Sequence, residues 1–494
     1  MKPSTPPPSH GLLRVLGPVL GTAIVVGTVI GSGVFKKPQM VAANVHFFAL
    51  TIGVWIAGGI FVMLGALSYA EVVVLYPRAG GNYVFLREAY GRLVSFLSGW
   101  VEFFVTRSAS IAALATIFTE SLNDVLKNSA FEQVAGLPAG THLSFWQQRA
   151  LTVAVIVALA GVNILGVKWG GVLQLFITLV KVGSLLAIIV LPFVAYAIAN
   201  PSANVPSPDS RLLSPVWPSS SSAFDMKMLV GIGTALLGVQ WAYHGWQNIS
   251  QVAEEVRNPQ RNVPVSLLLG VGIIMAVYVG ANVAYALILP QSEMAELKDT
   301  PVVTAFGLRL LGQLGAAAAS ATVMISVFGA LNGNILVGPR LPYAMSADGL
   351  APRPMAAIHP TFHTPAVATV VQTVWSVTLV VGAAVLTEFN LFLDPNESHF
   401  DLMTNFAMFG ALIFETLAVL SIFVFRRRYP DAARPYRCLG YPVVPALYIL
   451  FPLYVLTSVF LDSPGKALVG VGFILLGLVV YFVLGLNREA KPEG

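Results

Sequence analysis

Twelve long apolar stretches constrain what this chain can fold into more than any other feature of its sequence. A hydrocarbon core about 30 Å thick needs roughly 20 apolar residues for each helical crossing. Each stretch is continuous, whereas the strands of a membrane β-barrel alternate apolar and polar residues. Of the 494 residues, 56% are hydrophobic and only 10% are charged, against roughly one quarter charged in soluble domains. We therefore predict an all-α polytopic membrane protein with twelve transmembrane helices and no separate soluble domain. The stretches lie near residues 12–36, 45–75, 90–120, 149–167, 169–199, 228–255, 263–290, 301–338, 365–387, 401–425, 441–461 and 466–487.

The distribution of lysine and arginine predicts how the chain is oriented. Basic residues are densest after the second stretch, in 77–92, and after the tenth, in 426–437. Because basic loops stay on the cytoplasmic side, we expect a multi-pass protein of the cell membrane with both termini in the cytoplasm. The net charge of +5 then reports topology, and we expect no nucleic-acid partner. The proline-rich residues 1–11 are predicted to form a disordered cytoplasmic tail.

The first stretch contains "GTVIGSGVF" at 27–35, where three glycines interrupt an apolar helix. Broken backbone at membrane depth is tolerated only where it faces protein or a water-filled cavity. Such a break exposes the N–H groups of one half-helix and the C=O groups of the other. Opposed ends of this kind suit an amino acid zwitterion, although a small-xxx-small packing face is the alternative interpretation.

A second interruption occurs five stretches later. The sequence "LLGVQWAYHGWQN" introduces polar residues at Gln240, His244, Gln247 and Asn248. Two interrupted helices at matching positions indicate a transporter built from inverted repeats. We therefore predict one five-helix repeat at 12–199, a second at 224–425, and helices 11 and 12 at 440–487.

Several function classes are disfavoured by what the sequence lacks. Cys438 is its single cysteine, so an intrachain disulfide is impossible, and no Cys/His cluster has the spacing of a metal site. No Walker loop is present, so direct coupling to ATP hydrolysis is not expected. No nucleophile–base pair appears in the apolar stretches. We therefore predict that the protein is not an enzyme and has neither a metal nor a cofactor.

Several motifs, in order along the chain, are similar to those of a known family. They are "GTVIGSGVF", "PRAGGNYVFLREAYG" at 77–91, "WAYHGW" at 241–246, "VAEEVRNPQRNVP" at 252–264, "FGALNGNILVGPRLPYAMSADG" at 328–349 and "RPYRCLGYPVVP" at 434–445. The chain resembles the amino acid–polyamine–organocation (APC) superfamily, and within it the L-type amino acid transporter family, from about residue 12 to 487. This resemblance implies two inverted five-helix repeats with helices 1 and 6 unwound. It also implies transport of L-amino acids, commonly by sodium-independent exchange.

The resemblance assigns a substrate site to the two interruptions. The amides of Ser32, Gly33 and their neighbours would hold the substrate carboxylate, and carbonyls near Ile30 and in 240–244 would hold the α-ammonium. Trp241 matches an aromatic residue, often Phe, that closes over the substrate. His244 departs from the family, in which Gly or Asp is expected, and with Trp241 it argues for a small substrate side chain. The substrate-binding residues predicted in this way are Ile30, Gly31, Ser32, Gly33, Gln240, Trp241, Ala242, Tyr243 and His244.

Lys181 lies midway along the fifth stretch, far from either end. An ionisable group there is costly to insert, which favours a specific role. By the resemblance, its ammonium would take the place of a sodium ion bound by sodium-coupled relatives. It would tie helix 5 to the unwound backbone near Gly27–Gly31.

Four other polar residues within the stretches could line or support the pocket. Arg107 matches a basic residue of the family and could pair with Glu102, although a spacing of five is poor for an α-helical pair. Glu415 could be a hydrogen-bonded neutral carboxyl or a proton carrier, and the structural role is favoured. Asn332 could bond across helices or line the pocket.

The leading interpretation is a secondary transporter that exchanges small neutral L-amino acids without sodium. One alternative is a proton-coupled symporter in which Lys181, Glu102 or Glu415 would titrate. Another, from a different class, is an amino acid sensor that does not transport. By the resemblance, a heavy subunit would attach through a cysteine between helices 3 and 4. Because 121–148 contains none, we expect no disulfide-linked partner.

Overall fold

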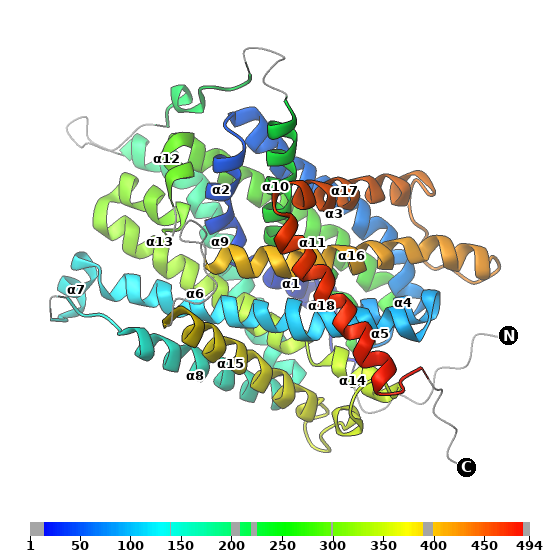
Figure 1. The fold of residues 1–494 in the computed structure, drawn as a ribbon. Helices are drawn as coiled ribbons and strands as arrows, with labels where there is room; N and C mark the ends of the chain where they lie inside the picture. The colour runs from blue at the N-terminus through cyan, green and yellow to red at the C-terminus, as the bar shows by residue number, and fades with distance from the viewer. Residues whose placement is uncertain are drawn as a thin grey trace.

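The computed structural model describes residues 14–138, 140–198, 208–218, 225–297, 300–388 and 399–487. Over these residues every regular element is a helix (Figure 1), as the apolar stretches predict. The predicted tail at 1–11 lies outside the described residues. The first half contains α1 (Pro18–Val29), α2 (Gly33–Asn44), α3 (Phe48–Leu75), α4 (Asn82–Tyr90), α5 (Arg92–Val101), the π-helix η1 (Glu102–Arg107), α6 (Ser108–Leu126), α7 (Ser129–Ala135), α8 (Phe145–Ile164) and α9 (Val167–Ile198).

The second half follows a short 3₁₀ turn, η2 (Ser210–Leu213). It contains α10 (Met226–Tyr243), the 3₁₀ turns η4 (Trp246–Ser250) and η5 (Ala253–Glu255), α11 (Pro259–Ala286), α12 (Gln291–Glu296), α13 (Val302–Val337), α14 (Arg340–Ala347), the 3₁₀ turn η6 (Arg353–Ala356), α15 (Ala366–Glu388), α16 (His399–Arg428), α17 (Val443–Asp462) and α18 (Pro464–Val483).

Ten helical segments in the described part are long and apolar enough to cross a membrane, or eleven if the bent pair α1 and α2 counts as one. The two members of that pair are inclined by 43°. The expected sixth crossing is not among the ten, since α10 is just 18 residues long and includes the polar Lys227 and Gln240, which lower its mean hydropathy. The twelve-helix count and the inverted repeats therefore stay predictions.

The helices differ in how deeply they lie in the protein. In the most apolar 18 residues of Arg92–Leu126 and of Ala407–Arg428, 67% of the residues are buried. The same share is 22% in Phe145–Ile164 and in Pro464–Val483. The exposed positions on the outer helices carry large apolar side chains such as Phe176, Leu453 and Leu476. In a membrane protein such side chains face lipid, so α8 and α18 are peripheral while α5, α6 and α16 are inner helices.

The broken helices lie among the inner ones. Helix α1 packs against α9, α11 and α13, and α10 packs against α2, α3, α16 and α17. In Figure 1 they lie among the surrounding helices, with α6, α8 and α15 packed together along one side. The two interruptions in the sequence therefore meet inside the protein.

Candidate functional site

The break between α1 and α2 lies against the end of α10. Helical hydrogen bonding stops after Ile30, whose ψ of 94° is extended, and α2 begins at Gly33. Helix α10 ends at Tyr243 and is capped by His244, and Gly245 follows with φ of 102°, a left-handed conformation that favours glycine. A Cβ added at Gly33 would lie 2.4 Å from Cα of Ala242. The glycines thus permit both breaks and their close approach.

The start of α2 presents backbone donors. Phe35 and Lys36 donate their amides to the carbonyl of Ser32. The preceding amides, from Gly31 to Val34, donate to no acceptor in the part of the chain that the structure describes. Unpaired N–H groups and the positive end of the helix dipole make this a place for an anion.

The end of α1 presents backbone acceptors, most of which have partners. The ammonium of Lys181 donates to the carbonyls of Gly27 (2.8 Å) and Ile30 (2.6 Å). The hydroxyl of Tyr278 lies 3.2 Å from the carbonyl of Val29 and 3.0 Å from that of Ala242, so it connects the two broken helices. The Thr28 carbonyl accepts no hydrogen bond from the described residues, which leaves an acceptor for a cationic ligand.

A small cavity of about 20 Å³ lies between these two sets of groups. Predicted residues Gly31, Ser32, Gly33, Trp241 and His244 line it. Trp241 lies with its indole nitrogen 3.5 Å from the Ser32 hydroxyl, and its ring is stacked on that of His244. The other lining residues are Thr28, Val29, Ser110, Leu114, Gly245, Ala330 and Asn334.

Four of the predicted residues are buried but do not line this cavity. Ile30 contributes its carbonyl to Lys181, and Ala242 contributes its carbonyl to Tyr278. The Tyr243 hydroxyl donates to the carbonyl of Trp55 at 3.3 Å, and Gln240 is also buried in α10. Residues 240–243 are helical and His244 is extended, so the side chains point to different sides and only Trp241 and His244 reach the cavity.

Lys181 is only 1% exposed and lies between three helices. It reaches from α9 to the end of α1, and Gly329 of α13 provides the space for its side chain. A Cβ at Gly329 would lie 2.7 Å from Cε and 3.0 Å from Nζ of Lys181. The contact expected with Gly27–Gly31 is present in the structure.

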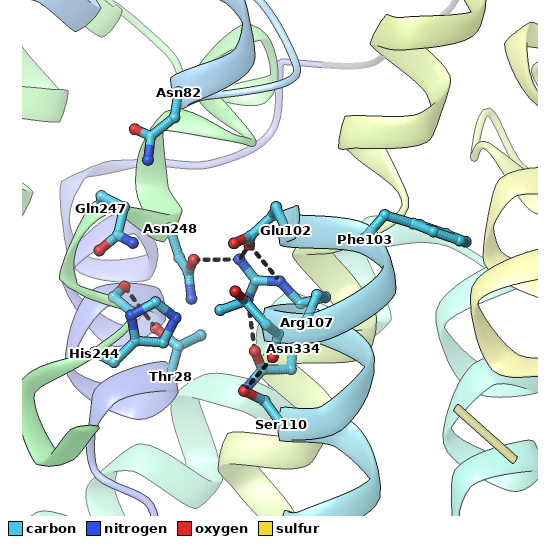
Figure 2. A network of polar contacts seen from close by, with 12 residues as sticks. Thr28, Asn82, Glu102, Phe103, Arg107, Ser110, His244, Gln247, Asn248 and Asn334 are labelled. Atoms are coloured by element: carbon cyan, nitrogen blue, oxygen red, sulfur yellow. Dashed lines mark hydrogen bonds and ion pairs between the residues drawn. The ribbon is translucent and has the colours of Figure 1, made fainter. Parts of the chain in front are cut away.

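Arg107 is at the centre of a polar network beside the cavity (Figure 2). Its guanidinium donates to Glu102 at 2.6 Å, to Asn334 at 2.5 Å and to Asn248 at 2.9 Å. The spacing of five between Glu102 and Arg107 allows the ion pair because the segment is a π-helix, in which i→i+5 is the repeating relationship. The network joins the π-helix to α13 and to the turn after α10.

The two remaining predicted residues have separate surroundings. Asn332 accepts from Asn163 and donates to Gln174, both at 3.0 Å, so it bonds across helices and does not line the cavity. Glu415 accepts a hydrogen bond from Gln247 at 2.6 Å, and its Oε1 lies 3.1 Å from Nδ1 of His244.

Residues that sequence reasoning missed include Ser110, Asn334 and Tyr278. Asn334 follows Asn332 by two positions in an apolar helix, which was the one available signal for it. Ser110 and Tyr278 are ordinary constituents of membrane helices and give no such signal.

The geometry offers a small site with backbone N–H groups at one end and a backbone carbonyl at the other. Side chains of Trp241, His244, Leu114 and Asn334 surround the remaining space. Among the described residues, no group of three His, Cys, Asp or Glu side chains could hold a metal ion. The arrangement is suited to binding a small zwitterion.

Comparison with known proteins adds an independent line of information. A family model described as amino acid permease matches residues 16–484. The serine/threonine exchanger SteT of Bacillus subtilis is 28% identical over 475 residues, which cover 96% of this chain and 97% of that protein. The human large neutral amino acids transporter small subunit 2 is 28% identical over 486 residues, covering 98% and 82%. The human b(0,+)-type amino acid transporter 1 is 28% identical over 484 residues, covering 97% and 90%.

Proposed function

Since this chain belongs to the amino acid permease family of the APC superfamily, we propose that it exchanges small neutral L-amino acids across the cell membrane, without sodium, by alternating access. The observation that carries this proposal is the pair of opposed helix ends around one buried cavity. The amides of Gly31, Ser32 and Gly33 are available for the substrate carboxylate. The carbonyl of Thr28 is available for the α-ammonium, whereas that of Ile30 accepts from Lys181 at 2.6 Å and from the Ser326 hydroxyl at 3.4 Å.

Sodium independence is supported by Lys181. Its ammonium donates to the carbonyls of Gly27 and Ile30, of which Ile30 also accepts from the Ser326 hydroxyl at 3.4 Å. An ammonium has three donors and no acceptor, so it satisfies carbonyls as a bound cation would. We infer that this fixed cation replaces a coupling ion.

A small side chain is supported by the cavity wall. Trp241 is a large aromatic residue, and the imidazole of His244 is stacked beside it. Together they fill the space that a bulky substrate side chain would need. Serine and threonine, after which the related SteT exchanger is named, are of the size that this wall favours, as is alanine.

The predicted topology is supported by contacts between loops that it assigns to the same side of the membrane. Leu16 pairs with Val256, and the hydroxyl of Tyr83 donates to Asp348 at 2.7 Å. These four residues lie in segments assigned to the cytoplasmic side. On the opposite side, Asn128 donates to the carbonyl of Gln313 at 3.0 Å. Both patterns fit twelve crossings in two inverted repeats with cytoplasmic termini.

We also propose that the protein works without a disulfide-linked heavy subunit. Cys438 is the only cysteine of the chain and is 5% exposed. Its backbone amide donates to Glu71 at 2.7 Å, and its sulfur lies 3.7 Å from the Ser68 hydroxyl. The thiol is thus enclosed between α3 and the loop that precedes α17.

The proposal is tested by exchange in proteoliposomes. Vesicles loaded with unlabelled alanine should take up labelled alanine much faster than empty vesicles at equal pH on both sides. Uptake into empty vesicles that needs a pH gradient would favour a proton-coupled symporter. Saturable binding of labelled alanine without any uptake would favour a sensor.

A further inference from the structure

The buried carboxylates of this protein differ in what neutralises them. In the part of the chain that the structure describes, four are buried: Glu71, Glu132, Glu255 and Glu415. Arginines, which stay charged at all physiological pH values, pair with Glu71 and Glu255. Glu132 accepts two backbone amides. Glu415 instead faces a histidine, the one of these partners whose charge changes near neutral pH.

The geometry places the histidine and the carboxylate in contact. Nδ1 of His244 lies 3.1 Å from Oε1 of Glu415, which is an ion-pair distance, although Nδ1 makes no hydrogen bond to any described residue. The two side chains are 8% and 6% exposed. Gln247 donates to the same oxygen at 2.6 Å, and an amide hydrogen bond leaves the charge of a carboxylate uncompensated. A buried carboxylate without a countercharge is costly. The pair is therefore most stable when it holds one proton, because its net charge is then zero.

The pair also separates two cavities. His244 lines the cavity between the broken helices. Glu415 lines a second cavity together with Gly80 of the loop after α3 and with Asn82 and Tyr83 at the start of α4. A proton that reaches Glu415 through the second cavity therefore needs to cross only the contact between Glu415 and His244 to reach the wall of the first cavity.

Other titratable groups lie near the pair, and most of them have hydrogen-bond partners of their own. Glu102 of η1 also lines the second cavity and is bound to Arg107. Tyr69 of α3 is within electrostatic range of Glu415 and shares a hydrogen bond with Ser250 at 2.7 Å. Two further tyrosines complete the set: Tyr448 of α17, within the same range, and Tyr83 of α4, which donates to Asp348. None of these groups supplies a positive charge to Glu415.

We propose that His244 and Glu415 form a proton-binding site in the wall of the substrate cavity, and that its proton must be bound for transport. The proposal rests on the proposed function, since it assigns a regulatory ligand to the same site. Loss of the proton leaves a bare carboxylate and a neutral imidazole at the end of α10. The resulting buried charge destabilises the break of α10 that the substrate needs.

Transport should be full at low pH and should fall as pH rises, because the active form of the protein is the one that holds the proton.

The test measures exchange of labelled alanine in proteoliposomes with the same pH inside and outside, from pH 5.5 to 9.5. Equal pH removes any gradient as a driving force. Wild-type exchange should fall by tenfold or more across the range, and Glu415→Gln should show a profile that is flat within twofold. Glu132→Gln is the matched control, because it removes a carboxylate that is buried far from this cavity, and it should keep the wild-type profile. A flat wild-type profile, or a Glu415→Gln profile like that of the wild type, would overturn the proposal.

A second measurement needs no transport and so separates this proposal from the proposed function. The melting temperature of the purified protein, measured against pH, should fall at high pH for the wild type. The difference between wild type and Glu415→Gln, and between wild type and His244→Gln, should depend on pH in the same range. A constant difference across the range would overturn the proposal even if neither variant transports. Failure of the wild type to exchange any amino acid would leave this readout intact and would count against the proposed function alone.

Discussion

Gly33 and Ala242 lie so close together that no side chain fits between the two broken helices. A Cβ at position 33 would lie 2.4 Å from Cα and 2.6 Å from Cβ of Ala242. The obstacle is backbone, which cannot rotate away as a flexible side chain can. The approach of α2 to the end of α10 therefore depends on glycine at this position.

We expect Gly33→Ala to reduce alanine exchange to less than a tenth of the wild-type rate. The added methyl group must push the start of α2 away from α10, and the carboxylate donors move with it. Gly161→Ala is the matched control, since a Cβ there meets no atom within 4 Å, and Ala is about 0.5–1 kcal/mol better than Gly within a helix. Exchange by Gly33→Ala at the wild-type rate would show that the contact does not shape the site.

Trp241 should determine which substrates enter. The wild type should bind alanine, serine and threonine more tightly than leucine or phenylalanine. Trp241→Ala removes the indole that crowds the cavity, so it should weaken alanine binding about tenfold or more and relax the preference against leucine, since pocket contacts of this kind are worth about 1–3 kcal/mol. Competition of unlabelled amino acids against labelled alanine measures both effects. A wild type that prefers leucine or phenylalanine would contradict the crowding argument.

The structure also specifies how to test the orientation of the chain. Cys438 is unsuitable for labelling because burial raises the pKa of its thiol and little thiolate is present at neutral pH. In a Cys438→Ala background, we therefore introduce Leu439→Cys or Gln133→Cys, both at exposed positions. With right-side-out vesicles and an impermeant thiol reagent, Gln133→Cys should be labelled at once. Leu439→Cys should be labelled only after permeabilisation, and the reverse result would invert the topology.

Much of the site could be predicted from the sequence because polar and glycine residues are conspicuous in apolar stretches. The two breaks, Lys181 and the intramembrane Arg107 all followed from that contrast. The helical content followed from the continuous apolar runs. Prediction of this kind works for residue types that cost free energy inside a membrane, because such residues are found there mainly where a contact or a function compensates the cost.

The rest depended on geometry that local sequence does not show. In an α-helix, residues five apart point about 140° away from each other, so only the π-helix brings Glu102 to Arg107. The contact of His244 with Glu415 joins residues 171 positions apart, and no periodicity predicts it. The hydroxyl of Tyr278, which connects Val29 to Ala242, belongs to a residue type that is common in membrane helices.

Substitutions at Gly329 and at Lys181 should have effects on the exchange rate that do not add. Because a Cβ at position 329 would lie 2.7 Å from Cε of Lys181, Gly329→Ala should displace the ammonium and slow exchange several-fold. In a Lys181→Ala background the same change should have a smaller effect than in the wild type, and what remains should come from Ile177, whose Cγ2 a Cβ at position 329 would meet at 2.3 Å. Additive losses in the double variant would mean that Gly329 acts through some other contact.

The most direct test of the account is whether Lys181 takes the place of a coupling ion. Its ammonium satisfies the carbonyls of Gly27 and Ile30, each of which would cost several kcal/mol if it were left dry. The measurement is alanine exchange in liposomes with sodium replaced by choline, for wild type and Lys181→Ala side by side, with gel filtration to show that both are folded. We predict that the wild type exchanges at the same rate in both salts, and that folded Lys181→Ala exchanges at less than a tenth of that rate. A sodium requirement in the wild type, or a wild-type rate in Lys181→Ala, would contradict the account.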